Sequence, residues 1–464
     1  MGNAKKRSGS VASMLPVLLA CSFTASFGQS MMNVALPELA ERFGVTLSIA
    51  NWVIVGYMVV AATAIMLSAF MLRRVFFVGA GALALGSACA LLSQDFPMLF
   101  ASRLVQAVGT GLFFPSVTSV IMTNSPAAVR GTRLALNSGV IAVGLAISPT
   151  ASGFALTQFG WRAMFVVSLA MSVALLAVGF FRIHGGPSTK RVPIDALSVM
   201  LGPLGLAAFL YGLGEVTRDL APSLAALAVG AVLLALFAWR QFALESPLLD
   251  LHPLVHPRFA VGILLVMVGM LTSFSMSILL PLYYEGALGY TAFFAGLLLL
   301  GPVLVNAAFT FLGGRVFDRH GAWPLIPAGL VLVLVGQATA FFSAESMIAI
   351  LIVLSSAAVY AGAGFVVAPS KTAALGTLPP ATYSAGASIN STAVQIASAI
   401  GSSLFVGVLS ADVLRDTAAG AAKASAYAAA FEHTLSIAVV IAAAGLLVAF
   451  FYARAMRKPA GKQR

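Results

Sequence analysis

The stretch from residue 134 to residue 156 reads LALNSGVIAVGLAISPTASGFAL and contains no charged side chain. Because a helix of about 20 apolar residues spans the hydrocarbon core of a bilayer, this stretch is long enough to cross a membrane. Gly139, Gly144 and Gly153 place small residues along it, and Pro149 predicts a bend in the helix. Small residues allow another helix to approach closely, so the stretch predicts a transmembrane helix packed tightly inside a bundle.

Similar apolar runs extend over the whole chain of 464 residues. Hydrophobic residues make up 60% of the sequence and charged residues 9%, and the mean hydropathy is +1.01. Soluble domains carry about 25% charged residues, so the composition indicates a protein whose solvent is lipid. We therefore expect an all-α integral membrane protein with fourteen transmembrane helices. The predicted helices cover residues 13–36, 51–72, 75–93, 98–122, 134–156, 163–181, 197–215, 222–241, 260–283, 292–313, 325–343, 347–370, 385–410 and 435–453.

The net charge of +12 comes from 26 Lys and Arg residues and 14 Asp and Glu residues. The basic residues lie in short clusters between the apolar runs, so we expect no nucleic-acid binding. With the N-terminus in the cytoplasm, 20 of the 26 fall on the cytoplasmic side and five on the outer side, and Arg103 lies within a helix. Cytoplasmic loops are typically rich in Lys and Arg. This pattern predicts a multi-pass protein of the cell membrane with both termini in the cytoplasm.

Polar connections divide the fourteen helices into groups of six, two and six. One polar stretch follows the sixth helix, and a second precedes the ninth. We expect residues 1–182 to form an N-terminal six-helix lobe and residues 183–259 to form two linking helices. Residues 260–464 are expected to form a C-terminal six-helix lobe with a basic cytoplasmic tail.

Several short motifs occur in the same order as in a known family. They are NVALPELA at 33–40, Arg103 followed by Gln106, Gly109 and Gly111, the glycine- and proline-containing helix at 134–156, the pair Trp161-Arg162, PLYYEGALGYT near Pro281, and GRVFDRHG at 314–321. On these motifs the chain resembles the fourteen-helix drug/proton antiporter family of the major facilitator superfamily. The resemblance implies two pseudo-symmetric six-helix lobes that rock about a central cavity, with two extra helices between them.

The resemblance also implies that Gly139, Gly144, Pro149 and Gly153 form the family's antiporter motif. Packing alone is the other interpretation of these small residues. The two interpretations are compatible, because a seam between lobes is also a gate.

A second motif implied by the resemblance is a cytoplasmic gate in the second half of the chain. In the family this motif is a loop in which an acid caps a helix or pairs with a base. The corresponding connection of the first half, at Arg73 and Arg74, is about seven residues shorter and has no acid, so we expect one of the two gates to be missing. The matching residues of the second half are Gly314, Arg315, Asp318, Arg319 and Gly321.

The charged residues near the membrane interior are few. An arginine near mid-membrane costs roughly 2.5 to 3.5 kcal/mol, so we expect Arg103 to face a cavity or a partner, with snorkelling to the outer interface as the alternative. Many family members carry an aspartate at the position of Gly28, and no acid of this chain lies at the centre of a predicted helix. The nearest candidate for proton coupling is Glu38, at the outer end of the first helix. Because Glu38 and Arg103 are predicted at similar depths, we expect them to form a charge pair.

Polar side chains within the predicted helices are candidates for lining a substrate cavity. Buried amides need partners, so hydrogen bonding between helices is an equally good interpretation. The candidates are Gln29, Asn33, Tyr57, Gln106, Asn137, Asn306, Asn390 and Gln395.

The sequence indicates a transporter and not an enzyme. It contains no Walker-type phosphate loop, no His or Cys cluster and no paired carboxylates at membrane depth, so we expect no cofactor and no metal. We expect a monomeric secondary transporter that exports small amphipathic compounds by proton antiport, with a small-molecule substrate, protons and the lipid bilayer as its partners. One alternative is export of a neutral or anionic metabolite, which the absence of a membrane-centre acid favours. Another is a degenerate transporter that acts as a sensor or partner protein.

Overall fold

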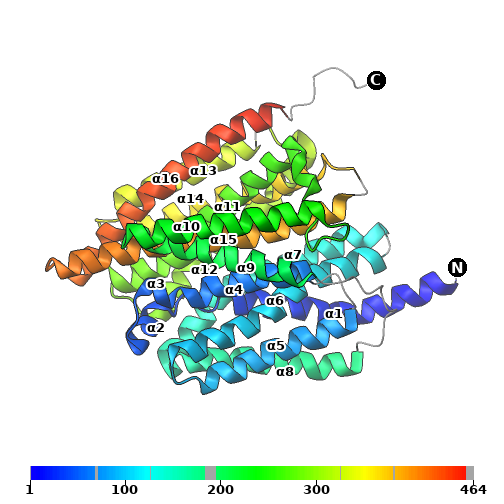
Figure 1. Cartoon of the computed structure of the whole chain (residues 1–464), viewed down its shortest axis with the longest axis horizontal. Coiled ribbons are helices and arrows are strands. Elements are labelled where there is room, and N and C mark those ends of the chain that lie inside the picture. The colour runs from blue at the N-terminus through cyan, green and yellow to red at the C-terminus, as the bar shows by residue number, and fades with distance from the viewer. Residues whose placement is uncertain are drawn as a thin grey trace. The chain divides into compact units, whose positions relative to one another are not determined.

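The computed structural model describes residues 2–67, 72–125, 127–182, 195–323, 325–379 and 382–455. Every regular element within these ranges is a helix (Figure 1). In chain order the helices are α1 (Gly2–Ser30), α2 (Leu36–Phe43), α3 (Leu47–Ala50), α4 (Trp52–Leu67), α5 (Leu72–Leu92), α6 (Phe96–Asn124), α7 (Ala127–Phe159), α8 (Arg162–Arg182), α9 (Ala196–Glu215), α10 (Leu220–Ala243), η1 (His252–Val255), α11 (Pro257–Gly286), α12 (Ala292–His320), α13 (Leu325–Ser343), α14 (Ala349–Leu375), α15 (Tyr383–Ala418) and α16 (Lys423–Ala455).

The fourteen predicted transmembrane helices correspond to fourteen apolar helices of the structure. Within the described residues, 13 helices are long and apolar enough to cross a membrane, and Met14–Ser30 of α1 is a shorter apolar helix. The expected all-helical membrane fold is therefore confirmed. Several helix ends differ from the prediction by more than three residues: α7, for example, begins at Ala127 and not at 134, and α14 ends at Leu375 and not at 370.

The first predicted helix, 13–36, is wrong at its C-terminal end. α1 ends at Ser30, turns follow, and α2 begins at Leu36. Pro37 opposes a continuous helix through this position, because a proline inside a helix lacks the N–H of the hydrogen-bond ladder and its ring clashes with the preceding turn. The same residue fits the first turn of a new helix. Glu38 therefore lies in the first turn of α2 and not at the end of α1.

The outer connection between the last two helices, expected at 411–434, is mostly helical. Only residues 419–422 connect α15 to α16. With 36 residues, α15 is about 54 Å long and exceeds the roughly 30 Å hydrocarbon core. Polar contacts join the two extended helix ends, because Asp412 lies 3.0 Å from Arg415 and 2.6 Å from His433 of α16. The composition of this segment predicts a loop, but these contacts stabilise it as a helix.

The structure contains two compact units. The first comprises Met1–Gly212, Ala221–Leu248 and Tyr290–Leu300, and includes α1 to α8, α10, most of α9 and the first turns of α12. In this unit α6 packs against α1, α4 and α5, and α5 also packs against α8; Figure 1 shows α1, α5, α6 and α8 close together. The buried core between them includes Phe76 and Phe113, whose ring centroids are 6.0 Å apart.

The second unit comprises Leu213–Leu220, Leu249–Gly289 and Gly301–Arg464. Within it α11 packs against α14, α15 and α16, and α13 packs against α14 and α16. Glycines bring α13 and α14 into backbone contact, since a Cβ at Gly329 would lie 2.8 Å from the carbonyl oxygen of Gly362. Such small-residue contacts are typical of helix packing in membranes.

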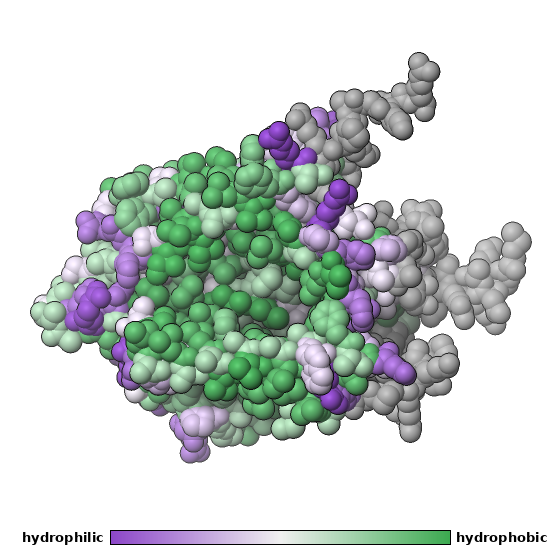
Figure 2. All heavy atoms as spheres, turned by 45° about the horizontal axis from the view of Figure 1, so that its top comes forward, coloured by the Kyte–Doolittle hydropathy of each residue, from purple (hydrophilic) through white to green (hydrophobic). Residues whose placement is uncertain are grey.

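Large hydrophobic side chains cover helix faces that a soluble protein would cover with charge. Phe180, Phe181, Phe342 and Phe451 each expose 68% or more of their surface. On the face drawn in Figure 2, hydrophobic residues fill the middle of the surface and hydrophilic residues lie toward its margins. Exposed apolar surface of this extent matches a lipid environment.

An ion pair joins the two predicted linking helices, α9 and α10. Arg240 of α10 donates to both carboxylate oxygens of Asp195, which directly precedes α9, over 2.6 and 2.8 Å. These hydrogen bonds, followed by those from Ser198, hold the pKa of Asp195 well below its ordinary value. The pair closes the α9–α10 hairpin at the end where the charge pattern predicts the cytoplasm.

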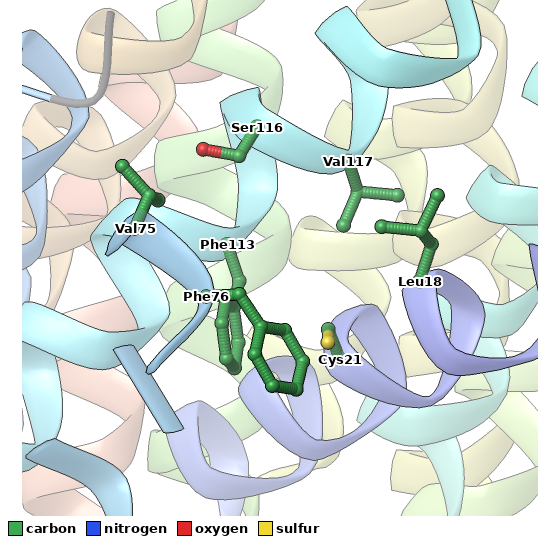
Figure 3. Close-up of a pocket in the computed structure, with 7 residues that line it drawn as sticks. All are labelled: Leu18, Cys21, Val75, Phe76, Phe113, Ser116 and Val117. Carbon is green, nitrogen blue, oxygen red and sulfur yellow. The ribbon is translucent and has the colours of Figure 1, made fainter. Parts of the chain in front are cut away.

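A small cavity lies between α1, α5 and α6 (Figure 3). Its volume is about 10 Å³, roughly the room that one water needs, so it is too small for a drug-like compound. Cys21 is free and buried, and behaves there as a small hydrophobic side chain. The lining residues are Leu18, Cys21, Val75, Phe76, Phe113, Ser116 and Val117.

Candidate functional site

Arg103 of α6 is fully buried and is the centre of the candidate site. Its Nη1 donates to the carbonyl oxygen of Gly28 over 3.1 Å and to Oε1 of Gln106 over 2.7 Å. Its Nε donates to the carbonyl oxygen of Val53 over 3.4 Å. The guanidinium carbon lies 4.1 Å from the centroid of the Tyr57 ring, which is a cation–π distance. Arg103 thus joins α1, α4 and α6 and does not snorkel to the outer interface.

The position of Gly28 near the end of α1 explains why its carbonyl oxygen accepts this contact. The last four carbonyl groups of a helix have no partner inside the helix, and Gly28 belongs to this set because α1 ends at Ser30. A positive charge is also favoured at the negative end of the helix dipole. Gly28 itself places no side chain beside Arg103. A Cβ at this position would have one heavy-atom neighbour within 4 Å, the hydroxyl oxygen of Tyr57 at 3.6 Å.

Neutral polar side chains extend the site from Gln106 into two further helices. Nε2 of Gln106 donates to the hydroxyl of Ser87 in α5 over 2.7 Å, and this hydroxyl lies 3.1 Å from that of Ser168 in α8. The hydroxyl of Tyr57 makes a hydrogen bond with that of Thr110. All five side chains are buried. The positive charge therefore lies in a hydrogen-bonded network that is neutral among the partners described.

The charge pair expected between Glu38 and Arg103 is not formed. Among the described residues, no ion pair involves either side chain. The break after Ser30 places Glu38 in α2, away from the course of α1, so a similar depth does not bring the two charges together. The carboxylate of Glu38 instead hydrogen-bonds with the backbone of Trp161.

Glu38 lies in a half-buried environment at the start of α2. Burial raises the pKa of Glu38 above its ordinary value, the hydrogen bond with the Trp161 backbone opposes this shift, and the charge of Glu41 raises the pKa further. The ring of Trp161 is held between those of Phe43 and Phe165, at centroid distances of 5.7 and 6.1 Å. A carboxyl group in this position exchanges its proton closer to neutral pH than an exposed glutamate does.

Two of the three glycines in the predicted antiporter motif lie at close helix contacts. A Cβ at Gly144 would overlap the hydroxyl oxygen of Ser26 in α1, and a Cβ at Gly153 would overlap the carbonyl oxygen of Ala292 in α12. A Cβ at Gly139 would have no neighbour within 4 Å. Close packing therefore accounts for Gly144 and Gly153 but not for Gly139.

Two hydrogen bonds from the part of α7 that follows Pro149 add to the contact between α7 and α12. The hydroxyl of Thr150 donates to the carbonyl oxygen of Gly296 over 2.9 Å, and the backbone N–H of Phe293 donates to the hydroxyl of Thr157 over 3.3 Å. Both bonds join α7 to the first turns of α12. The motif therefore lies where two helices distant in sequence meet.

Several of the cavity-lining candidates form hydrogen bonds between helices. In addition to Tyr57 and Gln106, Asn137 of α7 accepts from the hydroxyl of Ser22 in α1 over 2.7 Å. Asn306 of α12 donates to the carbonyl oxygen of Tyr360 in α14 over 2.8 Å. These contacts agree with the packing interpretation. The first unit contains Gln29, Asn33, Tyr57, Gln106 and Asn137, and the second contains Asn306, Asn390 and Gln395.

The predicted cytoplasmic gate at 314–321 is helical, so the expectation of a loop is wrong. The first glycine of the motif does not end α12; the helix continues until Gly321, whose φ of +75° suits glycine. The N–H of Gly321 closes the helix on the carbonyl oxygen of Phe317 over 2.7 Å. Within the helix, the guanidinium carbon of Arg315 lies 4.3 Å from the ring centroid of Phe311.

Some side chains of the predicted gate, and those of the corresponding first-half connection, lie outside the described part of the structure. This applies to the side chain of Asp318 and to those of Arg73 and Arg74. Gly314 and Arg319 are described as parts of the last turns of α12. The gate function of these residues stays a prediction.

Sequence reasoning missed the hydroxyl partners of the site, Ser87, Ser168 and Thr110. The glycine that precedes Ser87 in the sequence, Gly86, could have indicated that Ser87 lies at a contact between helices. A Cβ at Gly86 would lie 2.5 Å from Cγ of Gln106, so this glycine marks the place where α6 approaches α5. A small residue beside a buried serine is thus a usable indication of a polar contact between helices.

Comparison with known proteins decides the family. The sequence model of the Major Facilitator Superfamily matches residues 18–402 and, separately, residues 262–463. The chain belongs to the Major Facilitator Superfamily. It is therefore a multi-pass membrane transporter with a small-molecule substrate.

Relatives within the superfamily cover almost the whole chain. The lincomycin resistance protein LmrB of Bacillus subtilis is 31% identical over 458 residues, which cover 95% of each chain. The LmrB of Listeria monocytogenes is 30% identical over 453 residues, 94% of this chain and 96% of the relative. Among solved structures, the POT family transporter PepTSo has a TM-score of 0.67 at 15% identity, covering 95% of this chain and 98% of that chain. The last likeness supports the superfamily fold alone.

Proposed function

We propose that the protein exports small amphipathic, drug-like compounds in exchange for protons. The observation that carries this proposal is the identity of 31% to a lincomycin resistance protein over 95% of both chains. The fourteen apolar helices and the absence of a soluble domain in the described residues agree with a carrier that uses an ion gradient and not ATP. Export removes a compound from the cytoplasm and so provides resistance.

In this proposal the protein is a monomer in the bacterial cell membrane. Its Lys and Arg distribution favours a cytoplasmic position of both termini. The lobes that rock in alternating access are residues 1–182 and 260–464, with 183–259 as the link. The close contacts of Gly144 and Gly153 with neighbouring helices support a role of α7 in this motion, because a tightly packed seam has few intermediate arrangements.

Proton exchange in this proposal uses Glu38. Its partial burial raises the pKa of the carboxyl group, and a carboxyl group that titrates nearer to neutral pH can load and release a proton as its exposure changes. Arg103 does not neutralise it, since the two form no ion pair in the part of the chain that is described. Proton binding at Glu38 therefore does not require the separation of a charge pair.

Two measurements test this function. Bacteria with and without the protein are compared in a growth-inhibition panel that includes lincomycin and compounds of different charge, and we expect higher inhibitory concentrations in cells that contain it. Purified protein in proteoliposomes should release protons when an exported compound is added, and Glu38→Gln should move the compound without this release. Equal inhibitory concentrations with and without the protein for every compound of the panel would instead favour a degenerate transporter that acts as a sensor or partner protein.

A further inference from the structure

Among the residues that the structure describes, no acidic side chain forms an ion pair with Arg103. The side chain of Arg103 has 0% exposure, and its described partners are two backbone carbonyl oxygens, one amide oxygen and one aromatic ring. A guanidinium stays protonated in proteins, so the charge is permanent.

One nitrogen of this guanidinium is also unused. Nη1 and Nε donate to protein acceptors, whereas Nη2 donates to no acceptor among the described residues. A buried donor without an acceptor is costly, and it is more costly when it carries charge. A carboxylate oxygen that accepts from Nη2 would form a charge-assisted hydrogen bond, which is roughly twice as strong as a bond between neutral groups.

We propose that Arg103 binds the anionic group, a carboxylate, of an amphipathic compound that the protein transports. This inference rests on the export function proposed above and names the charge class of its substrate. The ring of Tyr57, whose centroid lies 4.1 Å from the guanidinium carbon, stacks on Arg103 and holds the charge in place for such a ligand. Gly28 of α1, whose carbonyl oxygen accepts from Arg103, has no side chain. This position of α1 therefore brings no charge that competes with the ligand.

A purely structural role of Arg103 is the competing explanation. In that case the hydrogen bond from Arg103 only satisfies the carbonyl group of Gly28 near the end of α1. The charge of a compound then has no influence on its rate of transport. The two explanations differ at Gly28, because an aspartate there would place a carboxylate beside Arg103 from within the protein. A Cβ at Gly28 meets only the hydroxyl oxygen of Tyr57, at 3.6 Å, so the position accepts a side chain without steric overlap at Cβ.

The test uses inverted membrane vesicles that contain the full chain and three probes with one fluorophore. Dansylglycine is anionic, dansylglycinamide is neutral and dansylcadaverine is cationic at neutral pH. We expect wild type to transport dansylglycine faster than the amide at equal low concentration. Gly28→Asp should lower the ratio of dansylglycine to dansylglycinamide transport by about tenfold, because it occupies a charge-assisted contact. Gly28→Asn, with the same shape and no charge, should keep the wild-type ratio.

The results separate this proposal from the export function. If wild type transports the neutral or cationic probe but not dansylglycine, or if Gly28→Asp and Gly28→Asn change the ratio equally, the anion site is refuted and export stands. If wild type transports no probe and the inhibitory concentrations in the growth panel are the same with and without the protein, the export function is refuted. The anion site, which rests on that function, is then refuted as well. Should Gly28→Asp not accumulate in the membrane, the order of the three probes on wild type decides, since a structural arginine gives no preference for the acid over its amide.

Discussion

Arg103 and Gly28 are joined by a hydrogen bond of 3.1 Å from the guanidinium to the last turn of α1. One end of the contact is a permanent charge, and the other is a carbonyl group that its own helix cannot satisfy. The bond therefore fixes where α1 ends relative to α6. It also gives a buried cation a partner that carries only a partial negative charge.

The amide of Gln106 accepts from Arg103 and donates to Ser87, so its loss should affect stability more than the loss of Ser87. We expect Gln106→Leu to cost about 1 to 3 kcal/mol, because it leaves buried polar groups without partners. Ser87→Ala removes one hydrogen bond to a neutral amide and should cost less. Thermal unfolding of the purified variants in detergent measures both effects, and equal midpoints would contradict the proposed network.

Three glycines of α7 provide a graded test of helix contact. Gly153→Ala should abolish transport while the protein still inserts, because the new methyl group would overlap the backbone of Ala292, which cannot rotate away. Gly144→Ala should be milder, since the nearest atom is the hydroxyl of Ser26, whose side chain can turn. Gly139→Ala meets open space and should be tolerated. Transport assays with membrane quantification check the order, and three equal activities would show that these contacts are unimportant.

The pKa shift of Glu38 predicts a pH-dependent effect of Glu38→Gln on stability. Because the folded pKa is raised above the ordinary value of 4.5, wild type loses stability relative to its unfolded state as the pH rises through the folded value. The glutamine variant has no such loss. The unfolding temperature of Glu38→Gln minus that of wild type should therefore increase from about pH 4 to about pH 8.

Glu41→Gln removes, from an exposed position of α2, a neighbouring charge that raises the pKa of Glu38. In the Glu41→Gln background, the effect of Glu38→Gln on the unfolding temperature should therefore change less with pH. A difference for Glu38→Gln that is constant across the pH range would show that burial does not shift this carboxyl group.

The charge distribution predicts the topology of the chain. Reporter fusions at Arg464 should be active in the cytoplasm, and fusions after Gly160 should be active outside, since Gly160 lies in the connection between α7 and α8. A fusion after Gly289, between α11 and α12, should also report the exterior. Fusions at Arg464 and Gly160 that report the same side would contradict the fourteen-helix arrangement.

Much of the fold could be predicted from the sequence because hydrophobic length is a local property. Each apolar run long enough to span a bilayer forms a helix, since backbone groups in lipid must find partners within their own segment. The helix ends were less predictable. Pro37 starts a new helix where hydropathy alone continued the first one, and Asp412 and Arg415 continue α15 where their charge predicted its end.

The candidate site could be predicted in its members but not in its contacts. The type of residue identified Arg103 as an intramembrane charge, since few residues of this kind are tolerated there. Its partner was predicted as Glu38 from depth along two helices. Depth fixes one coordinate only, and the direction in which a side chain points depends on the rotation of each helix and on the turn after Ser30.

The sequence by itself determined that the chain lies in a membrane, how many apolar helices it has, and which charge lies among them. Composition and spacing suffice for this, because lipid acts on each segment separately. Tertiary structure alone decided that the buried guanidinium of Arg103 meets the carbonyl group of Gly28, the amide of Gln106 and the ring of Tyr57, and no carboxylate among the described residues. Such contacts join helices that are distant in the sequence, and their geometry follows from how the helices pack.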